Sequence, residues 1–336
     1  MFANGDVSVA RAILPAMTGS EPVTAKVLVI GWGFLGAAVG RRLLADGRSV
    51  TGLTRSRTWR TEAGTHAGAH IIVGDAGDTE LLNDALRDIE HVVFALGGHS
   101  PPTAAAQPSV AAMAMLLPLV AVTEALRGRP RVGLTYMSSG GAVYGNPARL
   151  PVREEDPARP ISPYGASHLA AETFAEMAAR RSGSMLQILR CSNVYGPHQA
   201  HGGDQGAVAI FLHRINRGES IKIFGDGSAL RDYVFVEDVA GVVSRLVIDR
   251  IDTGTVNVAS GIGMSVLDVA ITISDAVGKE AIIDHQPERS FDVRDIVLDI
   301  SRLQSFLPYV PTDFATGLAA TAAAYAEGIP QASPNR

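Results

Sequence analysis

The sequence predicts an α/β fold: a doubly wound parallel sheet followed by a smaller C-terminal α+β lobe. Two observations support this prediction. From residue 26 to residue 190, short apolar runs alternate with helical stretches, which is the pattern of repeated β-α-β units. The first apolar run also leads directly into a glycine-rich turn and a helix. Because ligands of such sheets bind at the carboxyl ends of the strands, functional residues are expected where each apolar run stops.

The elements of the first half follow in order along the chain. Lys26–Ile30 is a short apolar strand, and the helical run 37–45 comes after its glycine-rich turn. Further strands are expected at residues 50–54, 70–73, 91–96, 132–137 and 185–189, with helices at residues 79–89, 111–126 and 165–180. This series predicts a first domain of residues 26–190.

The second half has looser spacing and mixed element types. Short strands are expected at residues 221–224, 233–236, 256–258 and 282–285, with helices at residues 207–217, 239–248 and 266–277. This mixture predicts that residues 191–327 are mainly a lobe that closes over a bound substrate. Residues 1–25 and 328–336 have little to bury, so a flexible extension and a loose tail are expected there.

The composition excludes several classes of function. The chain has 336 residues and a net charge of −5 without a long basic run, which argues against a nucleic-acid partner. No run of about 18 uncharged apolar residues is expected to span a bilayer, so no membrane partner is predicted. Cys191 is the only cysteine and cannot form an intramolecular disulfide, which favours a reducing, cytoplasmic compartment.

The glycine-rich turn Gly31-Trp32-Gly33-Phe34-Leu35-Gly36 lies between a strand and a helix. In this context Gly31 permits a tight turn, Gly33 lets the backbone approach a pyrophosphate, and Gly36 lets the helix pack against the sheet. The N-terminus of the helix attracts the phosphate charge. The pattern therefore predicts a Rossmann-type sheet that binds a dinucleotide.

The choice between NAD and NADP is expected to depend on the end of the second strand. Sheets of this type that bind NAD place a carboxylate there for the ribose hydroxyls. This chain has Thr54-Arg55-Ser56-Arg57 instead. A guanidinium suits the 2′-phosphate of NADP, so Arg55 favours NADP over NAD, and a solvated surface arginine is the alternative.

A tyrosine and a histidine lie four residues apart at the start of an alanine-rich helix, in Ser162-Pro163-Tyr164-Gly165-Ala166-Ser167-His168. Positions i and i+4 share a helix face, so the two side chains are expected to be neighbours. A nearby cation lowers the pKa of a phenol from about 10 and makes it a general base. The pair predicts redox chemistry on an alcohol.

Several motifs in order resemble the extended short-chain dehydrogenase/reductase family, the NAD-dependent epimerase/dehydratases that act on nucleotide sugars. The resemblance extends from Lys26 to about Tyr325. The motifs that carry it are the Gly31–Gly36 loop, Ser138-Ser139-Gly140-Gly141-Ala142-Val143-Tyr144-Gly145, Ser162-Pro163-Tyr164, Cys191-Ser192-Asn193-Val194-Tyr195-Gly196-Pro197, Phe224-Gly225-Asp226-Gly227 and Arg231-Asp232-Tyr233.

The resemblance implies a catalytic role for three residues. Tyr164 would take the proton of the alcohol, Ser139 would orient the same oxygen, and a hydride would pass to the nicotinamide. Ser138 is the reserve for Ser139, because Gly140 occupies the family's usual hydroxyl position. His168 stands where the family has a lysine that contacts the nicotinamide ribose and stabilises tyrosinate. Histidine has a pKa near 6.5 and a shorter reach, so weaker or pH-dependent catalysis is expected, or cofactor binding without turnover.

The resemblance also implies contacts to the two ligands. Asp75 would hold the adenine, with a loop-capping role as the alternative, and the candidate contacts to the nucleotide diphosphate of the substrate are Asn193, Arg231 and Arg294. Arg294 is alternatively part of a solvated loop. No metal site is predicted, because the histidines near residue 200 lie in a glycine-rich loop. The full set of expected cofactor contacts is Gly31, Gly33, Phe34, Leu35, Gly36, Arg55, Asp75, Leu96, Tyr164 and His168.

The absence of one motif narrows the implied reaction. Sugar dehydratases of the family carry an Asp-Glu pair after the serine or threonine, where this chain has Gly140, Gly141 and Ala142. We therefore predict 4-epimerisation of an NDP-hexose through a transient 4-keto intermediate. Two alternatives are an NADP-dependent nucleotide-sugar 4-ketoreductase and a cofactor-binding regulatory protein with impaired catalysis. The resemblance further implies a homodimer formed by the helices near residues 111–126 and 164–180.

Overall fold

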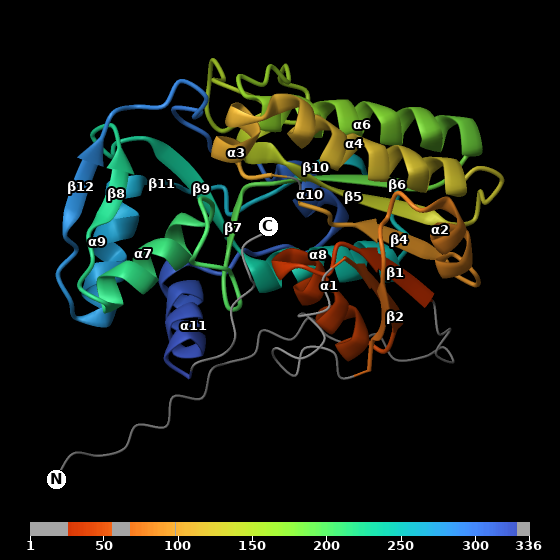
Figure 1. Ribbon diagram of the computed structural model, residues 1–336, viewed down its shortest axis with the longest axis horizontal. Helices are drawn as coiled ribbons and strands as arrows, with labels where there is room; N and C mark the ends of the chain where they lie inside the picture. Colours follow the sequence, from red (N-terminus) through yellow and green to blue (C-terminus); the bar gives the residue numbers. More distant parts are fainter. Residues whose placement is uncertain (1–25, 56–67, 98, 328–336) are drawn as a thin grey trace, which may run out of the picture.

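The computed structural model describes residues 26–55, 68–97 and 99–327 (Figure 1). The segments 1–25 and 328–336, expected to be an extension and a tail, lie outside these residues. A parallel sheet with the strand order β10-β6-β5-β4-β1-β2-β3 confirms the predicted fold class. Its strands are β1 (Lys26–Ile30), β2 (Ser49–Thr54), β3 (His70–Val73), β4 (His91–Phe94), β5 (Gly133–Ser139), β6 (Leu186–Cys191) and β10 (Gly254–Val258).

Helices cover both faces of the sheet, which is why its strands are apolar on both sides (Figure 1). In β1, Val27 and Val29 join one core and Leu28 and Ile30 join the other. The first core contains side chains of α1 (Phe34–Ala45) and α8 (Val236–Ile248). The second contains side chains of α2 (Thr79–Ala85), α4 (Pro108–Ala125) and α6 (Pro163–Ser182), and the short α3 (Pro101–Ala106) precedes α4.

A second lobe with its own apolar core lies beside the carboxyl ends of the strands (Figure 1). One small sheet has the order β11-β9-β7, and β12 pairs with β8 in another. The strands of the lobe are β7 (Asn193–Tyr195), β8 (Ile221–Phe224), β9 (Leu230–Phe235), β11 (Gly263–Ser265) and β12 (Ile283–Gln286). The remaining helices are α5 (Gly140–Val143), α7 (Ala207–Asn216), α9 (Val266–Val277), α10 (Ser301–Phe306) and α11 (Phe314–Ala326).

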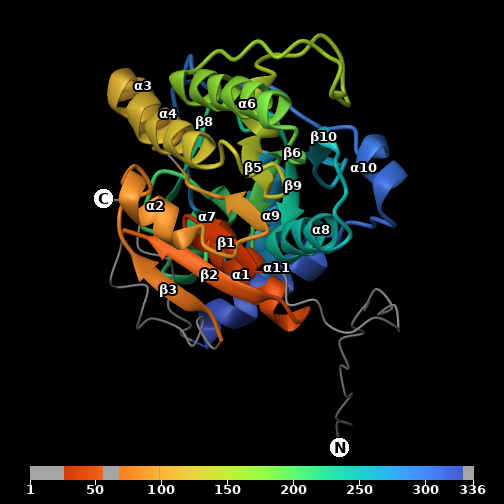
Figure 2. The ribbon, with the colours of Figure 1, turned by 90° about the vertical axis from the view of Figure 1, so that its right-hand side faces the viewer.

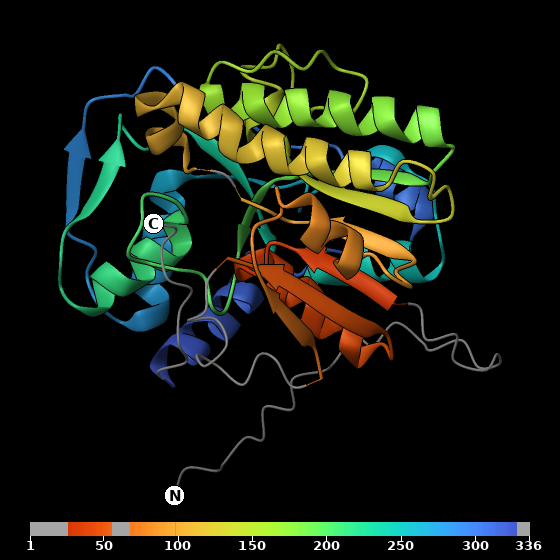
Figure 3. The same cartoon turned by 45° about the vertical axis from the view of Figure 1, so that its right-hand side comes forward.

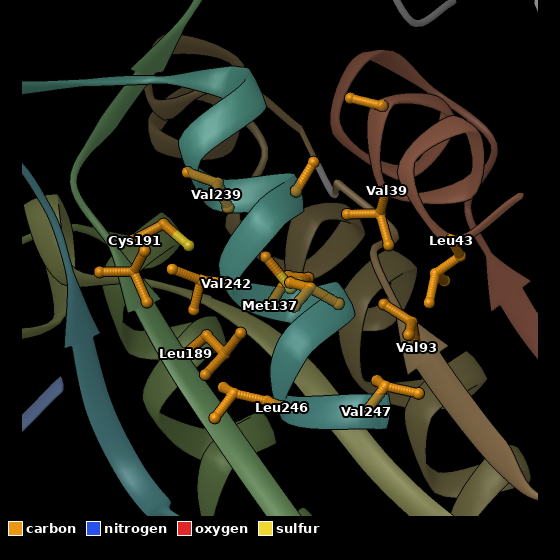
Figure 4. Packing of buried hydrophobic residues seen from close by; sticks show 14 of the residues in the cluster. Val39, Leu43, Val93, Met137, Leu189, Cys191, Val239, Val242, Leu246 and Val247 are labelled. Atoms are coloured by element: carbon orange, nitrogen blue, oxygen red, sulfur yellow. The ribbon is translucent and has the colours of Figure 1, made fainter. Parts of the chain in front are cut away.

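The expected boundary at residue 190 needs a correction. Both α8 and β10 come from the second half of the chain, yet β10 pairs with β6 and extends the main sheet (Figure 2). The reason is the valine-rich face of α8, which finds its partners in the sheet and in α1 rather than in the second lobe. Figure 4 shows this contact between Val239, Val242, Leu246 and Val247 of α8, Met137, Leu189 and Cys191 of the sheet, and Val39 and Leu43 of α1.

Helix α4 bears on the expectation that the chain has no membrane span. Among the residues that the structure describes, it is the one helix long and apolar enough, by length and composition alone, to cross a membrane. It lies alongside α6 (Figure 3) and buries Met115, Leu119 and Val122 in the second core, between these helices and the sheet. Its outer side leaves Met113 and Leu117 exposed at 54% and 61%. The helix therefore has one face in the core and one apolar face on the surface.

Candidate functional site

The glycine-rich loop places three glycines in different surroundings. Gly31 has φ +96°, and a Cβ there would lie 2.6 Å from the backbone nitrogen of Leu96. A Cβ on Gly36 would collide with the carbonyl oxygen of Gly31. A Cβ on Gly33 would meet no protein atom within 4 Å. Gly31 and Gly36 are thus required by the protein's own packing, whereas Gly33 borders open space that suits a ligand.

The N-terminus of α1 is suited to an anionic ligand. Gly33 is its N-cap residue and provides no side-chain hydrogen bond, and its first turn contains no acidic residue. The first backbone N–H groups of a helix have no partner within the helix, and the helix dipole attracts negative charge to them. Phe34 and Leu35 follow Gly33 and are partly buried against the first core, and Leu96 is partly buried against the second core. These residues fit a dinucleotide pyrophosphate.

Trp32 anchors this loop, a role that the sequence analysis missed. Its side chain is only 1% exposed. A Cβ on Gly40 of α1 would collide with the indole ring, and a Cβ on Gly52 of β2 would lie 2.7 Å from its Cδ2. The signal was present in the sequence, because a glycine inside a strand often marks a close approach of another group.

Arg55 and Asp75 lie at neighbouring strand ends. The register of β2 and β3 pairs Thr54 with Val73, and both Arg55 and Asp75 follow these strands as exposed residues. The carboxylate of Asp75 accepts a hydrogen bond of 2.7 Å from the backbone nitrogen of Gly77. This is the loop-capping role that was the alternative to an adenine contact.

Tyr164 lies in the first turn of α6. Ser162 caps this helix by accepting a hydrogen bond of 3.1 Å from the nitrogen of Gly165, and Pro163 occupies its start. The rings of Tyr164 and His168 make an edge-to-face contact with 4.6 Å between their centroids. The i, i+4 spacing therefore brings the two side chains together, as the sequence predicts.

Tyr164 interacts with Ser139 at the end of β5 and with Gln205. Burial raises the pKa of Tyr164 above its usual value of 10.0, and hydrogen bonding with Ser139 and Gln205 opposes this rise. The hydroxyl of Ser138 instead donates to Glu172 at 2.5 Å, because consecutive residues of a strand point to opposite faces. The structure thus brings Ser139, not Ser138, to Tyr164. Gln205 lies in a loop that gave no sequence signal.

Gly140 explains why the hydroxyl lies one residue earlier than in the resembling family. A Cβ on Gly140 would lie 2.8 Å from the backbone oxygen of Arg190 and 2.5 Å from the Cδ1 of Leu298. A serine at this position would therefore displace the neighbouring backbone. Ser139, which directly precedes Gly140, is the hydroxyl-bearing residue nearest to this position along the chain.

His168 is buried and uncharged. The residue is 4% exposed, and burial lowers the pKa of His168 to about 4. The Nδ1 atom lies 2.8 Å from the hydroxyl oxygen of Tyr136, and Nε2 has no hydrogen-bond partner within the described residues. At pH 7 this imidazole cannot replace the positive charge of a lysine, because its pKa of about 4 lies well below neutral pH.

A buried ion pair connects α6 to the central sheet. Arg190 of β6 donates to both carboxylate oxygens of Glu172 of α6, at 3.0 Å from Nε and 2.7 Å from Nη2. The guanidinium also lies over the ring of Tyr144, 4.8 Å from its centroid. Because Ser138 donates to the same carboxylate, the network connects α6 to β5 and β6. It holds the N-terminal half of α6 against the strand that carries Ser139.

Asn193 lies next to this site on the side of the second lobe. It pairs with Tyr233 in the register of β7 and β9. A Cβ on Gly141 would lie 3.5 Å from its Oδ1 atom, which places Asn193 beside the segment after Ser139. Its Nδ2 atom is buried and has no partner within residues 26–55, 68–97 and 99–327. An unpaired buried donor is costly, so it suits a ligand oxygen.

Arg231 and Arg294 are not equivalent. Arg231 donates from Nη1 to the backbone oxygens of Leu230 at 2.8 Å and Arg294 at 2.7 Å, and burial lowers the pKa of Arg231. The side chain of Arg294 is 84% exposed and lies 3.9 Å from Asp295. Asp232 pairs with neither arginine, because serine hydroxyls and backbone N–H groups surround it. The structure therefore joins Arg231 to the backbone of residue 294 and leaves the Arg294 side chain at the surface.

The histidine-containing loop near residue 200 has a packing role. His201 stacks on His213 of α7 with 3.7 Å between the ring centroids, and the Nδ1 atom of His213 lies 2.9 Å from the hydroxyl of Tyr325. In the part of the chain that the structure describes, no group of three or more potential metal ligands comes together.

Comparison with known sequences identifies relatives along most of the chain. The sequence pattern of the NAD dependent epimerase/dehydratase family matches residues 27–259. A UDP-glucose 4-epimerase of Mycolicibacterium smegmatis is 33% identical over 296 residues, covering 86% of this chain and 94% of that protein. A putative UDP-glucose 4-epimerase of Methanocaldococcus jannaschii is 30% identical over 276 residues, covering 82% of this chain and 90% of that protein.

Solved structures show the same architecture. A UDP-glucose 4-epimerase of Thermotoga maritima with UDP-glucose has a TM-score of 0.85 and 28% identity, covering 90% of this chain and 99% of that one. A UDP-glucose 4-epimerase of Thermus thermophilus in complex with NAD has a TM-score of 0.82 and 30% identity, with the same coverage. Because the family pattern, the relatives and the fold all agree over most of its length, this chain belongs to the NAD dependent epimerase/dehydratase family, within the extended short-chain dehydrogenase/reductases.

Proposed function

We propose that this protein catalyses the 4-epimerisation of a nucleotide-diphosphate hexose through a transient 4-keto intermediate. The observation that carries this proposal is the contact of Tyr164 with Ser139 at the carboxyl end of β5, the edge of the sheet where ligands bind. The glycine-rich loop follows β1 at the same edge. Relatives named UDP-glucose 4-epimerases support the choice of reaction.

In this proposal each residue has a distinct task. Ser139 holds the 4-oxygen of the sugar, and Tyr164 accepts its proton and later returns it. When bound, NAD or NADP would supply the redox chemistry, accepting a hydride from the carbon that bears the 4-oxygen and returning it to the other face of that carbon. The neutral His168 leaves Tyr164 largely protonated at pH 7, so the reaction is expected to be slow.

Dehydration is less well supported than epimerisation. The segment after Ser139 forms α5 and contains no carboxylate in Gly140–Val143. Elimination of water needs an acid and a base next to the sugar. The geometry around Ser139 therefore favours reactions that need proton and hydride transfer alone.

The native protein tests this function directly. It is incubated with UDP-glucose and UDP-galactose, each with NAD or NADP, and both sugar nucleotides and reduced cofactor are quantified over time. Interconversion without net change in the cofactor supports an epimerase. A parallel incubation contains a 4-keto sugar nucleotide with NADH or NADPH, and stoichiometric consumption of the reduced cofactor there supports the ketoreductase instead.

A second candidate function is cofactor binding with little or no turnover. The low pKa of His168, about 4, favours it, because no cation from this residue stabilises a tyrosinate at Tyr164. Tight binding of NAD or NADP together with no conversion of any UDP-, dTDP- or GDP-hexose would support this candidate over the enzyme.

We infer that Arg231 binds the diphosphate of the substrate while it holds the segment at Arg294 in place. Replacing Arg231 with Ala is expected to weaken UDP binding at least tenfold, about 1.4 kcal/mol, because a partly buried guanidinium is lost from the site. Titration calorimetry with UDP and with NAD measures both affinities. Arg245→Ala on α8, which removes an ion pair with Asp249, is the matched control. Equal loss of UDP and NAD binding in the Arg231 variant would indicate a structural role.

We propose that NADP binds more tightly than NAD. The support is Arg55, an exposed guanidinium directly after β2, where a carboxylate would select NAD. Arg55→Ala is expected to narrow the difference between the two affinities by roughly 1–3 kcal/mol. Calorimetry on the native and variant proteins checks this, with Arg245→Ala as the control. Equal native affinities would contradict the proposal, and the NAD-bound relative from Thermus thermophilus makes the comparison informative.

We also propose that two copies of the chain form a dimer through α4 and α6. These helices lie side by side (Figure 3) and share an exposed apolar surface. Leu117→Glu is expected to convert the dimer to a monomer, because a charge would be buried in the interface. Light scattering after size-exclusion chromatography measures the mass. The control is Val310→Glu, at a residue that is 85% exposed and lies outside α4 and α6. A monomeric native protein would overturn the proposal. The surface consists of Val110, Met113, Leu117, Phe174 and Met177.

A further inference from the structure

Tyr136 is a fully buried tyrosine in the middle of β5 whose hydroxyl belongs to no role described so far. The residue is 0% exposed. Its hydroxyl oxygen lies 2.8 Å from Nδ1 of His168 and 3.6 Å from the sulfur of Met115. The rings of Tyr136 and His168 have centroids 6.1 Å apart. The proton of this buried hydroxyl can be donated either to the imidazole of His168 or to the thioether of Met115.

We propose that Tyr136 is a positioning residue that holds His168 in the tautomer with the proton on Nε2. The inference rests on the proposed function, because it gives His168 a use in that site as a neutral hydrogen-bond donor. The ligand group that it would meet is a hydroxyl oxygen of the bound cofactor.

The Tyr136 hydroxyl has a single proton to donate. An imidazole nitrogen is a strong acceptor and a thioether sulfur is a weak one, so the proton goes to Nδ1 of His168 rather than to Met115. A neutral imidazole carries one N–H, and an Nδ1 that accepts a hydrogen bond leaves that proton on Nε2. Burial keeps the ring neutral by lowering the pKa of His168 to about 4. The tautomer therefore follows from the contact with Tyr136.

The other ring nitrogen of His168 has a different environment. Nε2 of His168 is buried and has no partner within the described residues. The two ring nitrogens point in widely different directions, so Nε2 faces away from the Tyr136 hydroxyl that contacts Nδ1. His168 also shares a helix face and a ring contact with Tyr164. A directed donor without a protein partner, one helical turn from the proposed base, is suited to an oxygen of a bound ligand.

A neutral His168 would offer the ligand a hydrogen bond of defined direction but no positive charge. The ammonium of a lysine can donate in three directions and carries a positive charge, whereas the imidazole donates along one N–H bond. Without a hydrogen bond at Nδ1, either tautomer of a buried neutral histidine is available. Tyr136 would thus convert His168 from an ambiguous group into a donor of fixed orientation.

The tautomer is measured on the protein as purified, without cofactor. Long-range ¹H–¹⁵N NMR spectra of the ¹⁵N-histidine protein report which ring nitrogen carries the proton, and His168→Leu assigns the signal of His168 by its loss. We expect a protonated Nε2 and a bare Nδ1 in the native protein and in Met115→Leu, and a mixture of tautomers in Tyr136→Phe. A proton on Nδ1 in the native protein, or an unchanged tautomer in Tyr136→Phe, would overturn the proposal.

A double-mutant cycle with NAD and NADP as probes tests the use of this donor. Tyr136→Phe is expected to weaken binding of the tighter cofactor roughly three- to tenfold, the range for one hydrogen bond, and to have no effect in the His168→Leu background. Equal losses in both backgrounds would show a structural role and contradict the proposal. Tyr309→Phe, which removes a buried hydroxyl bonded to the oxygen of Ala259, is the matched control. Neither readout needs sugar turnover, so an inactive protein would contradict the proposed function without deciding the tautomer.

Discussion

Tyr164→Phe is expected to lower the rate of sugar epimerisation roughly 10²- to 10⁴-fold, the range for loss of a general acid-base. The substitution keeps the ring, and with it the contact to His168, but removes the hydroxyl that interacts with Ser139 and Gln205. Single-turnover reduction of bound cofactor by UDP-glucose measures the hydride step itself. NAD and NADP affinities should remain close to native values.

Ser138 and Ser139 provide the controls for this prediction. Ser139→Ala is expected to slow the same step, because this hydroxyl faces Tyr164. Ser138→Ala removes a hydrogen bond to Glu172 and is expected to lower thermal stability more than rate. An unchanged rate in Tyr164→Phe would show that another residue is the base.

His168→Lys is the gain-of-function counterpart of this experiment. A lysine supplies a cation that lowers the pKa of the neighbouring phenol, and the native imidazole is neutral because burial lowers the pKa of His168 to about 4. We expect the lysine variant to be faster than the native protein at pH 7. A variant that binds cofactor and shows no gain would indicate that the pocket around Tyr136 cannot accommodate an ammonium.

Gly33→Val is expected to abolish binding of both NAD and NADP while the protein stays folded. A Cβ at this position meets no protein atom within 4 Å, so the side chain would enter the space that a pyrophosphate needs rather than the core. Calorimetry with each dinucleotide measures binding, and circular dichroism with thermal unfolding measures the fold.

Gly36 and Gly241 provide two comparison variants for this prediction. Gly36→Val is expected to destabilise the fold itself, because its Cβ would collide with the oxygen of Gly31. A Cβ on Gly241 of α8 would meet only the guanidinium of Arg42, at 3.1 Å. Gly241→Val should therefore keep both the fold and cofactor binding. Unchanged cofactor affinity in a folded Gly33 variant would mean that the loop does not hold the dinucleotide.

Local patterns were sufficient to predict most of the fold. The apolar run Lys26–Ile30 became the central strand β1, and the glycine-rich turn led into α1 as expected. Ser162 and Pro163 marked the start of α6, which placed Tyr164 and His168 on one face. These features depend on neighbours within a few residues in the chain, so the sequence alone was enough to locate them.

The assignment of α8 and β10 required the tertiary structure. Their amphipathic patterns predicted a helix and a strand but did not say against which core they would pack. The valines of α8 are buried between the parallel sheet and α1, which lies about two hundred positions earlier in the chain. Burial of a matching apolar face decided their place, and a pattern of local hydrophobicity does not contain the partner face.

The same distinction applies to the site. The sequence by itself determined which residue types were available: a glycine loop, a phenol, neighbouring serines and a histidine in place of lysine. The tertiary structure decided which serine faces Tyr164, because the strand alternates its faces and Gly140 has no room for a side chain. It also gave His168 its partner, Tyr136, from a strand more than thirty residues earlier. Partners and protonation states arise from burial and long-range contact, and for that physical reason they became visible in the folded chain alone.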